Sequence, residues 1–152
     1  MPTAWRIVKQ KYAATAFTGE GASRSGGRWN SRGTWVVYAS GSKSLAALET
    51  LVHLNPPVLF SYVSFRLDFP ESLIETFPLE QLPADWTGHP PPPAVQLVGD
   101  AWVRSGSSPI LALPSVIIPG ETNFLLNPRH PAFPRIRIGP PEPFAFDQRL
   151  LK

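Results

Sequence analysis

The stretch GGRWNSRGTWVVYASGSKSLAALETLVHL, residues 26–54, decides the organisation of this 152-residue chain. It contains an arginine after two glycines, a β-branched and aromatic run that reaches Tyr38, and a helical pattern with a single carboxylate, Glu49. Glycines let a backbone come close to a ligand, and a guanidinium binds phosphate through paired hydrogen bonds. The stretch therefore predicts a strand, a turn and a helix that can bring Arg28, Tyr38 and Glu49 to one phosphorylated, positively charged ligand.

The residues that follow this strand predict a helix over residues 45–54. Ser42 or Ser44 supplies an N-cap, and the prolines after the helix end it. At 100° per residue the leucines share one broad face, and Glu49 lies at its edge. Periodicity alone also fits a solvent-exposed Glu49 in weak contact with His53 at the i, i+4 spacing, so both interpretations stay open.

Strand patterns outnumber helical patterns in the rest of the chain. Nineteen prolines, spread along the sequence, favour short elements joined by stiff turns. We therefore expect one α+β domain over residues 1–152. Strands are predicted at 4–8, 34–39, 58–68, 74–76, 109–113, 115–118, 123–126, 135–138 and 144–147, a second helix at 94–104, a short helix or turn at 9–17, a helical turn at 83–86 and a flexible loop at 18–27.

Composition narrows the class of protein. Hydrophobic residues make up 43% of the chain, as in globular proteins, and the net charge of +3 permits an anionic ligand or an acidic partner. No dense run of lysine and arginine is present, so direct nucleic-acid binding is not expected. Cysteine is absent and no apolar run is long enough to span a bilayer, which favours a cytoplasmic protein without membrane contact.

Neither a metal site nor a known nucleotide-binding loop is predicted. The three histidines, His53, His89 and His130, lie far apart and lack the spacing of metal ligands. The patterns GxxxxGK[ST] and GxGxxG, which mark phosphate loops and dinucleotide folds, are both missing.

Three segments together resemble one known family. They are GGRWNSRGTWVVYAS (26–40), LAALETLVHL (45–54) and LPSVIIPGETNFLLNPRHP (113–131). They resemble the RES domain, a bacterial family named for its arginine, glutamate and serine. The resemblance covers roughly residues 5–138, and the last segment is its most specific part. The family's three residues fall on Arg28, Glu49 and Ser115, and Tyr38 matches an aromatic residue that family members place before the helix.

The resemblance implies a fold similar to that of ADP-ribosyltransferases, with a mixed, split β core around a cleft for NAD. It also implies a toxin of a type II toxin–antitoxin system, whose antitoxin is usually a helix-turn-helix protein of the Xre type. Family members consume NAD as a substrate, and at least some transfer ADP-ribose to a protein. A homodimer is left open.

The chemistry of NAD cleavage agrees with these four residues. Breaking the bond between nicotinamide and ribose passes through an oxocarbenium-like state, as in other glycosidic bonds. Arg28 suits the pyrophosphate, Tyr38 can stack on the nicotinamide ring, and Glu49 can stabilise the developing cation. Because no histidine–acid pair lies near Ser115 in the sequence, we assign it a binding role, towards the nicotinamide ribose or its amide.

Further polar residues are weaker candidates. Asn30, Ser40 and Asn123 are predicted to make polar contacts with NAD. Surface residues with a possible phosphate contact, each more often simply solvated, are Arg32, Arg129 and His130.

The leading interpretation is thus an NAD-consuming toxin, a glycohydrolase or a phosphorylase. The alternative is a mono-ADP-ribosyltransferase that modifies a cellular protein. A non-catalytic nucleotide-binding module is a third class. Sequence does not decide whether water, phosphate or a protein side chain accepts the ADP-ribose.

Overall fold

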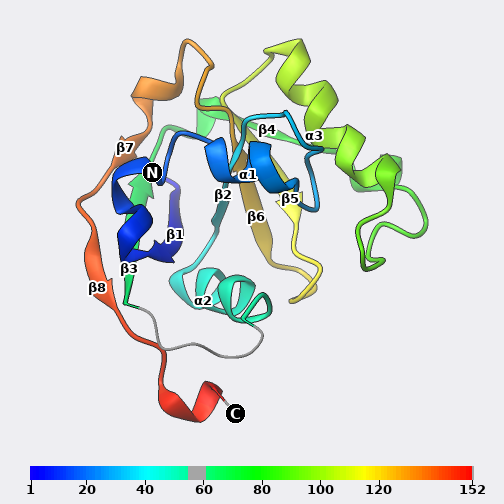
Figure 1. Ribbon diagram of the computed structural model, residues 1–152. Helices are drawn as coiled ribbons and strands as arrows, with labels where there is room; N and C mark the ends of the chain where they lie inside the picture. Colours follow the sequence, from blue (N-terminus) through cyan, green and yellow to red (C-terminus); the bar gives the residue numbers. More distant parts are fainter. Residues whose placement is uncertain (55–60, 152) are drawn as a thin grey trace.

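The structure, a computed structural model, describes residues 1–54 and 61–151. Its elements alternate between short strands and short helices along the chain (Figure 1). The strands are β1 (Thr3–Lys9), β2 (Val37–Ser40), β3 (Tyr62–Asp68), β4 (Ile74–Thr76), β5 (Ile110–Pro114), β6 (Thr122–Leu126), β7 (Arg137–Ile138) and β8 (Glu142–Phe144), and the α-helices are α1 (Glu20–Ser25), α2 (Lys43–Leu51) and α3 (Pro93–Ser105).

The strands of the described residues form one mixed sheet in the order β4-β5-β6-β2-β1-β3-β7, and β8 pairs with β3 beside this path. The pair of β4 and β5 is parallel, and the other pairs are antiparallel. Figure 1 shows α1 in front of β2, α3 beside β5 and α2 at the end of the sheet where β2 finishes. The expectation of an α+β fold with a mixed sheet and short helices is confirmed.

Most elements lie where the sequence predicts them, and α2 shows why. The Ser42 side chain accepts a hydrogen bond of 3.0 Å from the amide of Leu45, so it is the N-cap. The helix ends at Leu51, before the predicted position 54. The predicted strand at 58–68 is confirmed for β3, and its first residues, 58–60, lie outside the described part.

Two sequence predictions were wrong. The loop predicted at 18–27 contains α1, because Thr18 accepts a hydrogen bond from the amide of Glu20 and Glu20 then pairs with Arg24 one turn later. The strand predicted at 115–118 is a turn, because the Ser115 hydroxyl accepts from the amides of Ile117 and Ile118. Apolar residues in that segment therefore do not continue the sheet.

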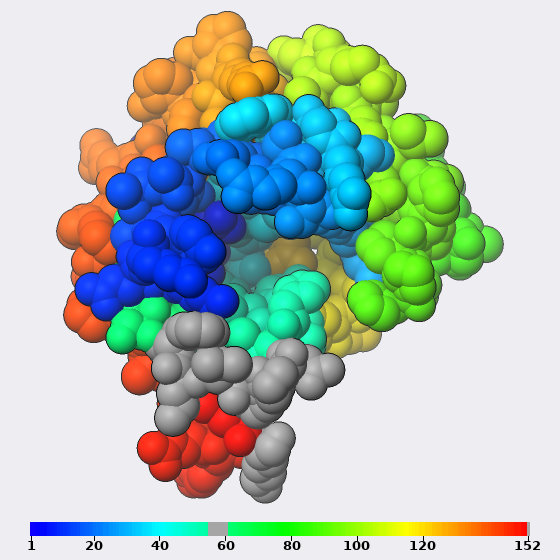
Figure 2. Space-filling model, viewed as in Figure 1, coloured from blue at the N-terminus to red at the C-terminus, as the bar shows by residue number. Residues whose placement is uncertain are grey.

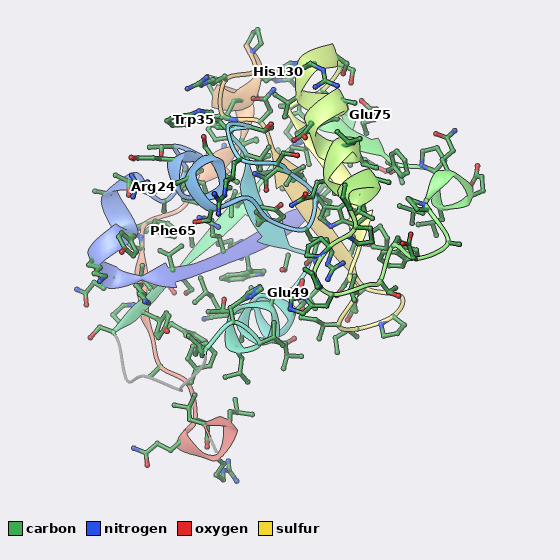
Figure 3. The ribbon with its side chains drawn as sticks, turned by 45° about the vertical axis from the view of Figure 1, so that its right-hand side comes forward. Arg24, Trp35, Glu49, Phe65, Glu75 and His130 are labelled. Carbon is green, nitrogen blue, oxygen red and sulfur yellow. The ribbon has the colours of Figure 1, made fainter. Side chains whose placement is uncertain are left out.

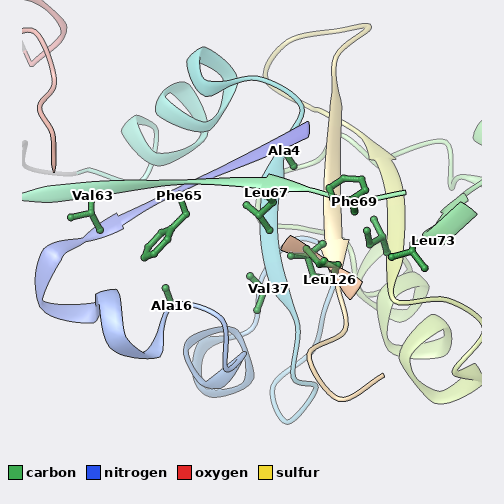
Figure 4. Close-up of a cluster of buried hydrophobic side chains, with 12 residues drawn as sticks. Ala4, Ala16, Val37, Val63, Phe65, Leu67, Phe69, Leu73 and Leu126 are labelled. Carbon is green, nitrogen blue, oxygen red and sulfur yellow. The ribbon is translucent and has the colours of Figure 1, made fainter. Parts of the chain in front are cut away.

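Side-chain alternation divides the core between the two faces of the sheet. On one face, Val37 and Leu126 join a cluster that includes Phe65 and Phe69 (Figure 4). On the other face, Leu125 joins a cluster of buried residues under α3 and the segment before β2, which are Trp29, Val36, Val95, Trp102, Leu111 and Leu113. This second face also carries Tyr38.

Helix α3 comes unusually close to the segment before β2. A Cβ atom at Gly99 would overlap the carbonyl oxygen of Trp29 and lie 2.9 Å from Cδ2 of Leu125. Only a residue without a side chain allows this approach. The helix begins with Pro93 in its first turn and ends at Gly106 in the left-handed conformation.

No helix within residues 1–54 and 61–151 has the length and apolar character needed to cross a membrane.

Candidate active site

The end of the sheet next to α2 brings together three chain segments. Ser40, the last residue of β2, is paired with Asn123 of β6, and Asn123 is paired with Leu113 of β5. Helix α2, which carries Glu49, begins three residues after Ser40. In the space-filling view the surface is hollowed between the blue segment before β2, the teal helix α2 and the yellow-gold start of β6 (Figure 2).

Glu49 is held at this hollow by a chain of hydrogen bonds. The side-chain amide of Asn123 donates to Oε2 of Glu49 over 2.5 Å. The other end of the same amide, Oδ1, accepts from the hydroxyl of Ser40 over 2.8 Å. Because a carboxylate only accepts, the NH2 end of Asn123 is the one directed at Glu49, and Oδ1 is left to accept from Ser40. Glu49 is half-buried, and among the described residues no hydrogen bond reaches its other oxygen, Oε1.

Arg28 is close enough to Glu49 for their charges to interact, and it is held by two carbonyl groups of the chain. Its Nη1 donates to the carbonyl oxygens of Trp86 and Gly88, over 3.1 and 2.9 Å. Burial lowers the pKa of Arg28, and the nearby Glu49 and Tyr38 partly oppose this. Within the described residues its Nε and Nη2 have no hydrogen-bond partner. These two nitrogens form the edge that grips a phosphate or carboxylate side-on.

The backbone before Arg28 is fixed by α3. Gln96 donates its side-chain amide to the carbonyl oxygen of Gly27 over 2.9 Å. Gly27 also lies so close to Tyr38 that a Cβ atom there would be 2.5 Å from the tyrosine oxygen. Gly27 therefore allows a close approach of backbone to Tyr38, whereas the sequence predicted an approach of both glycines to a ligand.

Tyr38 has its hydroxyl satisfied inside the protein. It donates to Oδ1 of Asn30 over 2.6 Å and accepts from the amide of Trp29 over 3.0 Å. Burial raises the pKa of Tyr38, although the Trp29 amide counteracts this. The phenol is therefore neutral, and it joins the segment before β2 to the floor of the hollow.

Asn30 is fully buried and uses its whole amide group within the protein. Its Nδ2 donates to the carbonyl oxygens of Ala22, Ser31 and Thr34, and its Oδ1 accepts from Tyr38. This places Asn30 behind Tyr38, where it orients the ring. Ser40 and Asn123 act on Glu49 in a similar way.

Ser115 lies at the same end of the sheet, one residue beyond β5. Only 2% of its surface is exposed, and its hydroxyl accepts from the amides of Ile117 and Ile118 at 3.2 and 3.1 Å. The backbone amide of Ser115 donates to the backbone carbonyl oxygen of Glu121, and this hydrogen bond closes the turn before β6. The structure thus brings Arg28, Tyr38 and Glu49 together, while Ser115 is seen to shape the turn that leads into Asn123.

The weaker candidates lie apart from this group. Arg32 and His53 are exposed, and Arg129 stacks over the ring of Trp35 with 4.2 Å between guanidinium carbon and ring centroid. His130 bonds Gly106. In Figure 3, His130 and Trp35 lie far from Glu49.

Two contributors escaped sequence reasoning. Gln96 reaches Gly27 across 69 positions, and a single glutamine on a helix gives no signal of such a contact. Arg6 interrupts an otherwise apolar strand, which was a visible signal. It donates to the carbonyl oxygens of Ala16 and Tyr38 over 2.8 and 2.9 Å, and burial lowers its pKa to about 10. Arg6 therefore supports β2 at Tyr38 from the opposite face of the sheet.

Within residues 1–54 and 61–151, no three histidine, cysteine, aspartate or glutamate residues are grouped so that they could hold a metal ion.

Comparison with known proteins places these features in context. The profile described as the RES domain matches residues 3–147. A Yersinia enterocolitica protein named Toxin Res is 40% identical over 148 residues, covering 96% of this chain and 97% of the relative. A Sphingobium protein named Prs ADP-ribosylating toxin is 34% identical over 154 residues, covering 97% and 96%.

One solved structure shares the fold. It is the MbcT–MbcA toxin–antitoxin complex of M. tuberculosis, in which the matching chain superposes with a TM-score of 0.77 at 19% identity. The match covers 94% of this chain and 84% of that chain.

Proposed function

The chain belongs to the RES domain family, and we propose that it is a toxin enzyme that consumes NAD by cleaving the bond between nicotinamide and ribose. The observation that carries this proposal is that Arg28 and Glu49 lie close enough for their opposite charges to interact. Each is oriented by groups of the protein, Glu49 by Asn123 and Arg28 by the carbonyls of Trp86 and Gly88. Such fixed charges stabilise a transition state without reorganising during the reaction.

In the proposed reaction Arg28 pairs through Nε and Nη2 with the pyrophosphate of NAD. The glycosidic bond breaks, and its electron pair neutralises the positive nitrogen of the nicotinamide ring. The ribose carbon becomes oxocarbenium-like, and the carboxylate of Glu49 stabilises that positive charge. Tyr38 contributes the face of its ring, since its hydroxyl is already bonded to Asn30.

The group that then bonds the ribose carbon defines the product. Water gives ADP-ribose and releases a proton, and inorganic phosphate gives ADP-ribose-1″-phosphate. We favour these two outcomes, a glycohydrolase or a phosphorylase. The alternative is transfer to a protein side chain, which is supported by the relative named Prs ADP-ribosylating toxin.

An enzyme that drains NAD in the cytoplasm harms its own cell unless a partner restrains it. The family suggests an antitoxin of the Xre helix-turn-helix type, and the solved structural neighbour is a toxin–antitoxin complex. We propose that a segment of the antitoxin enters the hollow and places a carboxylate on the free edge of Arg28, where the pyrophosphate would otherwise bind.

The test is incubation of the purified chain with NAD and measurement of free nicotinamide by chromatography, with Glu49→Gln as the matched control. We expect nicotinamide from the wild type and almost none from the variant. Parallel reactions with and without phosphate separate the two small products. An unchanged NAD pool after incubation with folded wild type, with and without phosphate and cell extract, contradicts NAD consumption.

A further inference from the structure

A second pocket lies beyond the other end of β2, away from Glu49. Its volume is about 470 Å³, and its walls are the loop Gly33–Trp35, the last turns of α3 and the turn that follows β6. Figure 3 shows Trp35 and His130, which both line it, at the far side of the molecule from Glu49. Small-molecule sites typically enclose about 300–1,000 Å³, so the pocket has room for a ligand larger than a single ion.

Two arginines line the pocket wall, and one of them, Arg104, interacts through its charge with Asp100, one turn earlier in α3. Arg104 projects from the last turn of α3, and Arg129 belongs to the turn after β6. Within the described residues, neither lies within 4.0 Å of a carboxylate oxygen. The guanidinium of Arg129 is stacked on Trp35, and stacking engages its face rather than its N–H groups.

A buried amide adds a third donor. Asn127 is 5% exposed and accepts a hydrogen bond of 3.0 Å from the amide of Arg129 through Oδ1. Its Nδ2 has no hydrogen-bond partner in the part of the chain that the structure describes. This NH2 group is therefore available to donate to a ligand.

The acceptors in the pocket are already in use. Oδ1 of Asp100 accepts from the amide of Ser31 over 2.9 Å. Burial works to raise the pKa of Asp100, but hydrogen bonds from Ser31 and Thr34 and the charge of Arg104 lower it overall. His130 accepts from Ala132 at Nδ1, so its Nε2 proton goes to the carbonyl of Gly106. With two arginines against the one carboxylate of Asp100, the lining carries an excess of positive charge.

We propose that this pocket binds the phosphoryl group of a small phosphorylated metabolite, with Arg104, Arg129 and the amide of Asn127 as donors. A phosphomonoester carries about two negative charges and three acceptor oxygens, which match two guanidinium groups and one amide. A carboxylate offers one charge and leaves donors unpaired. The rest of the metabolite occupies the volume beside Trp35. The site is separate from the hollow at Glu49 and does not depend on the reaction proposed there.

The test is calorimetric titration of the full chain, made as Glu49→Gln so that the protein can be expressed, with AMP, glycerol 3-phosphate and inorganic phosphate. We expect saturable binding of at least one phosphomonoester. Arg104→Gln and Arg129→Gln should each weaken it by about tenfold or more, as expected for the loss of a charged hydrogen bond. Both arginines are exposed, so the variants keep the fold.

Two controls separate this site from general charge and from the other hollow. Arg24→Gln removes an exposed arginine that pairs with Glu20, and Arg28→Gln removes the arginine beside Glu49. Both should leave the affinity within about twofold, below the effect of one charged hydrogen bond. Three results overturn the proposal: no saturable heat with any probe, a loss that follows Arg28→Gln instead of the pocket arginines, or inorganic phosphate binding as tightly as both esters.

Discussion

The amide of Asn123 donates to the carboxylate of Glu49 over 2.5 Å and so ties the start of β6 to helix α2. The two residues are 74 positions apart in the chain. Ser40, at the end of β2, donates to the other end of that amide. The position of the proposed catalytic carboxylate thus depends on a pair of side chains that do not themselves need to touch NAD.

Replacing Asn123 should affect turnover more than binding. Asn123→Ala removes the donor that orients Glu49, and a misplaced catalytic group costs about 10- to 100-fold in rate. We expect kcat to fall by this amount while KM changes little, with a loss of stability of about 1 kcal/mol. Steady-state kinetics with NAD measures the split. A variant that raises KM alone would instead show that Asn123 contacts the substrate.

Replacing Glu49 should nearly abolish the reaction. Glu49→Gln keeps the shape and an oxygen that accepts from Asn123, but it removes the negative charge near the ribose. We expect nicotinamide release to fall by a factor of about 100 to 1,000, with the melting temperature nearly unchanged. Full activity in a folded variant would remove Glu49 from the mechanism.

Replacing Arg28 by lysine tests whether NAD binding needs the planar shape of the guanidinium as well as its charge. Arg28→Lys keeps the charge, but one ammonium cannot bond the carbonyls of Trp86 and Gly88 and also present a planar edge to a pyrophosphate. We expect NAD affinity to fall by about tenfold or more in calorimetric titration, measured in the Glu49→Gln background. Equal affinities for the two proteins would contradict the pyrophosphate role.

Two glycines offer a matched comparison. In Gly27→Ala the new methyl group would lie 2.5 Å from the Tyr38 oxygen and 2.8 Å from Oδ1 of Asn30, so the Arg28 segment must shift. We expect a stability loss of about 1–3 kcal/mol and a large loss of activity. Gly21→Ala, in α1, meets no atom within 4 Å, and the substitution should stabilise the protein by about 0.5–1 kcal/mol. Denaturant unfolding checks both, and equal effects would show that the close approach at Gly27 is unimportant.

The lowered pKa of Asp100 predicts how the stability of the protein changes at acid pH. This pKa lies below the ordinary 3.8 because hydrogen bonds from Ser31 and Thr34 outweigh the opposing effect of burial. The folded state therefore binds fewer protons than the unfolded state near that pH, so Asp100 contributes stability above pH 3.8 that is lost as pH falls through the folded-state pKa. Melting temperatures between pH 3 and 7 should fall less steeply for Asp100→Asn than for wild type. Parallel curves would show that another group dominates.

The parts of the fold and of the site that the sequence predicted are those whose contacts join residues close together in the chain. The strand, cap and helix around Tyr38 and Ser42 are local, and periodicity with capping predicted them. The grouping of Arg28, Tyr38 and Glu49 was predicted from the stretch at 26–54, and the family pattern assigned these residues to NAD. The roles of Asn30, Gln96 and Asn123 came from neither, because a buried amide is recognised only once its partners across the sheet are known. Apolar composition at 115–118 resembled a strand, and only the hydrogen bonds of the Ser115 hydroxyl reveal a turn.

The closeness of α3 to Trp29 at Gly99 has a consequence for genetics. Any side chain at position 99 must move the helix outward, and Gln96 on the same helix would lose its hold on Gly27. If expression of the chain arrests growth, survivors of a selection for escape should carry substitutions at this buried glycine as well as at Glu49. A position that contacts no ligand would then be among those where substitution most readily abolishes toxicity.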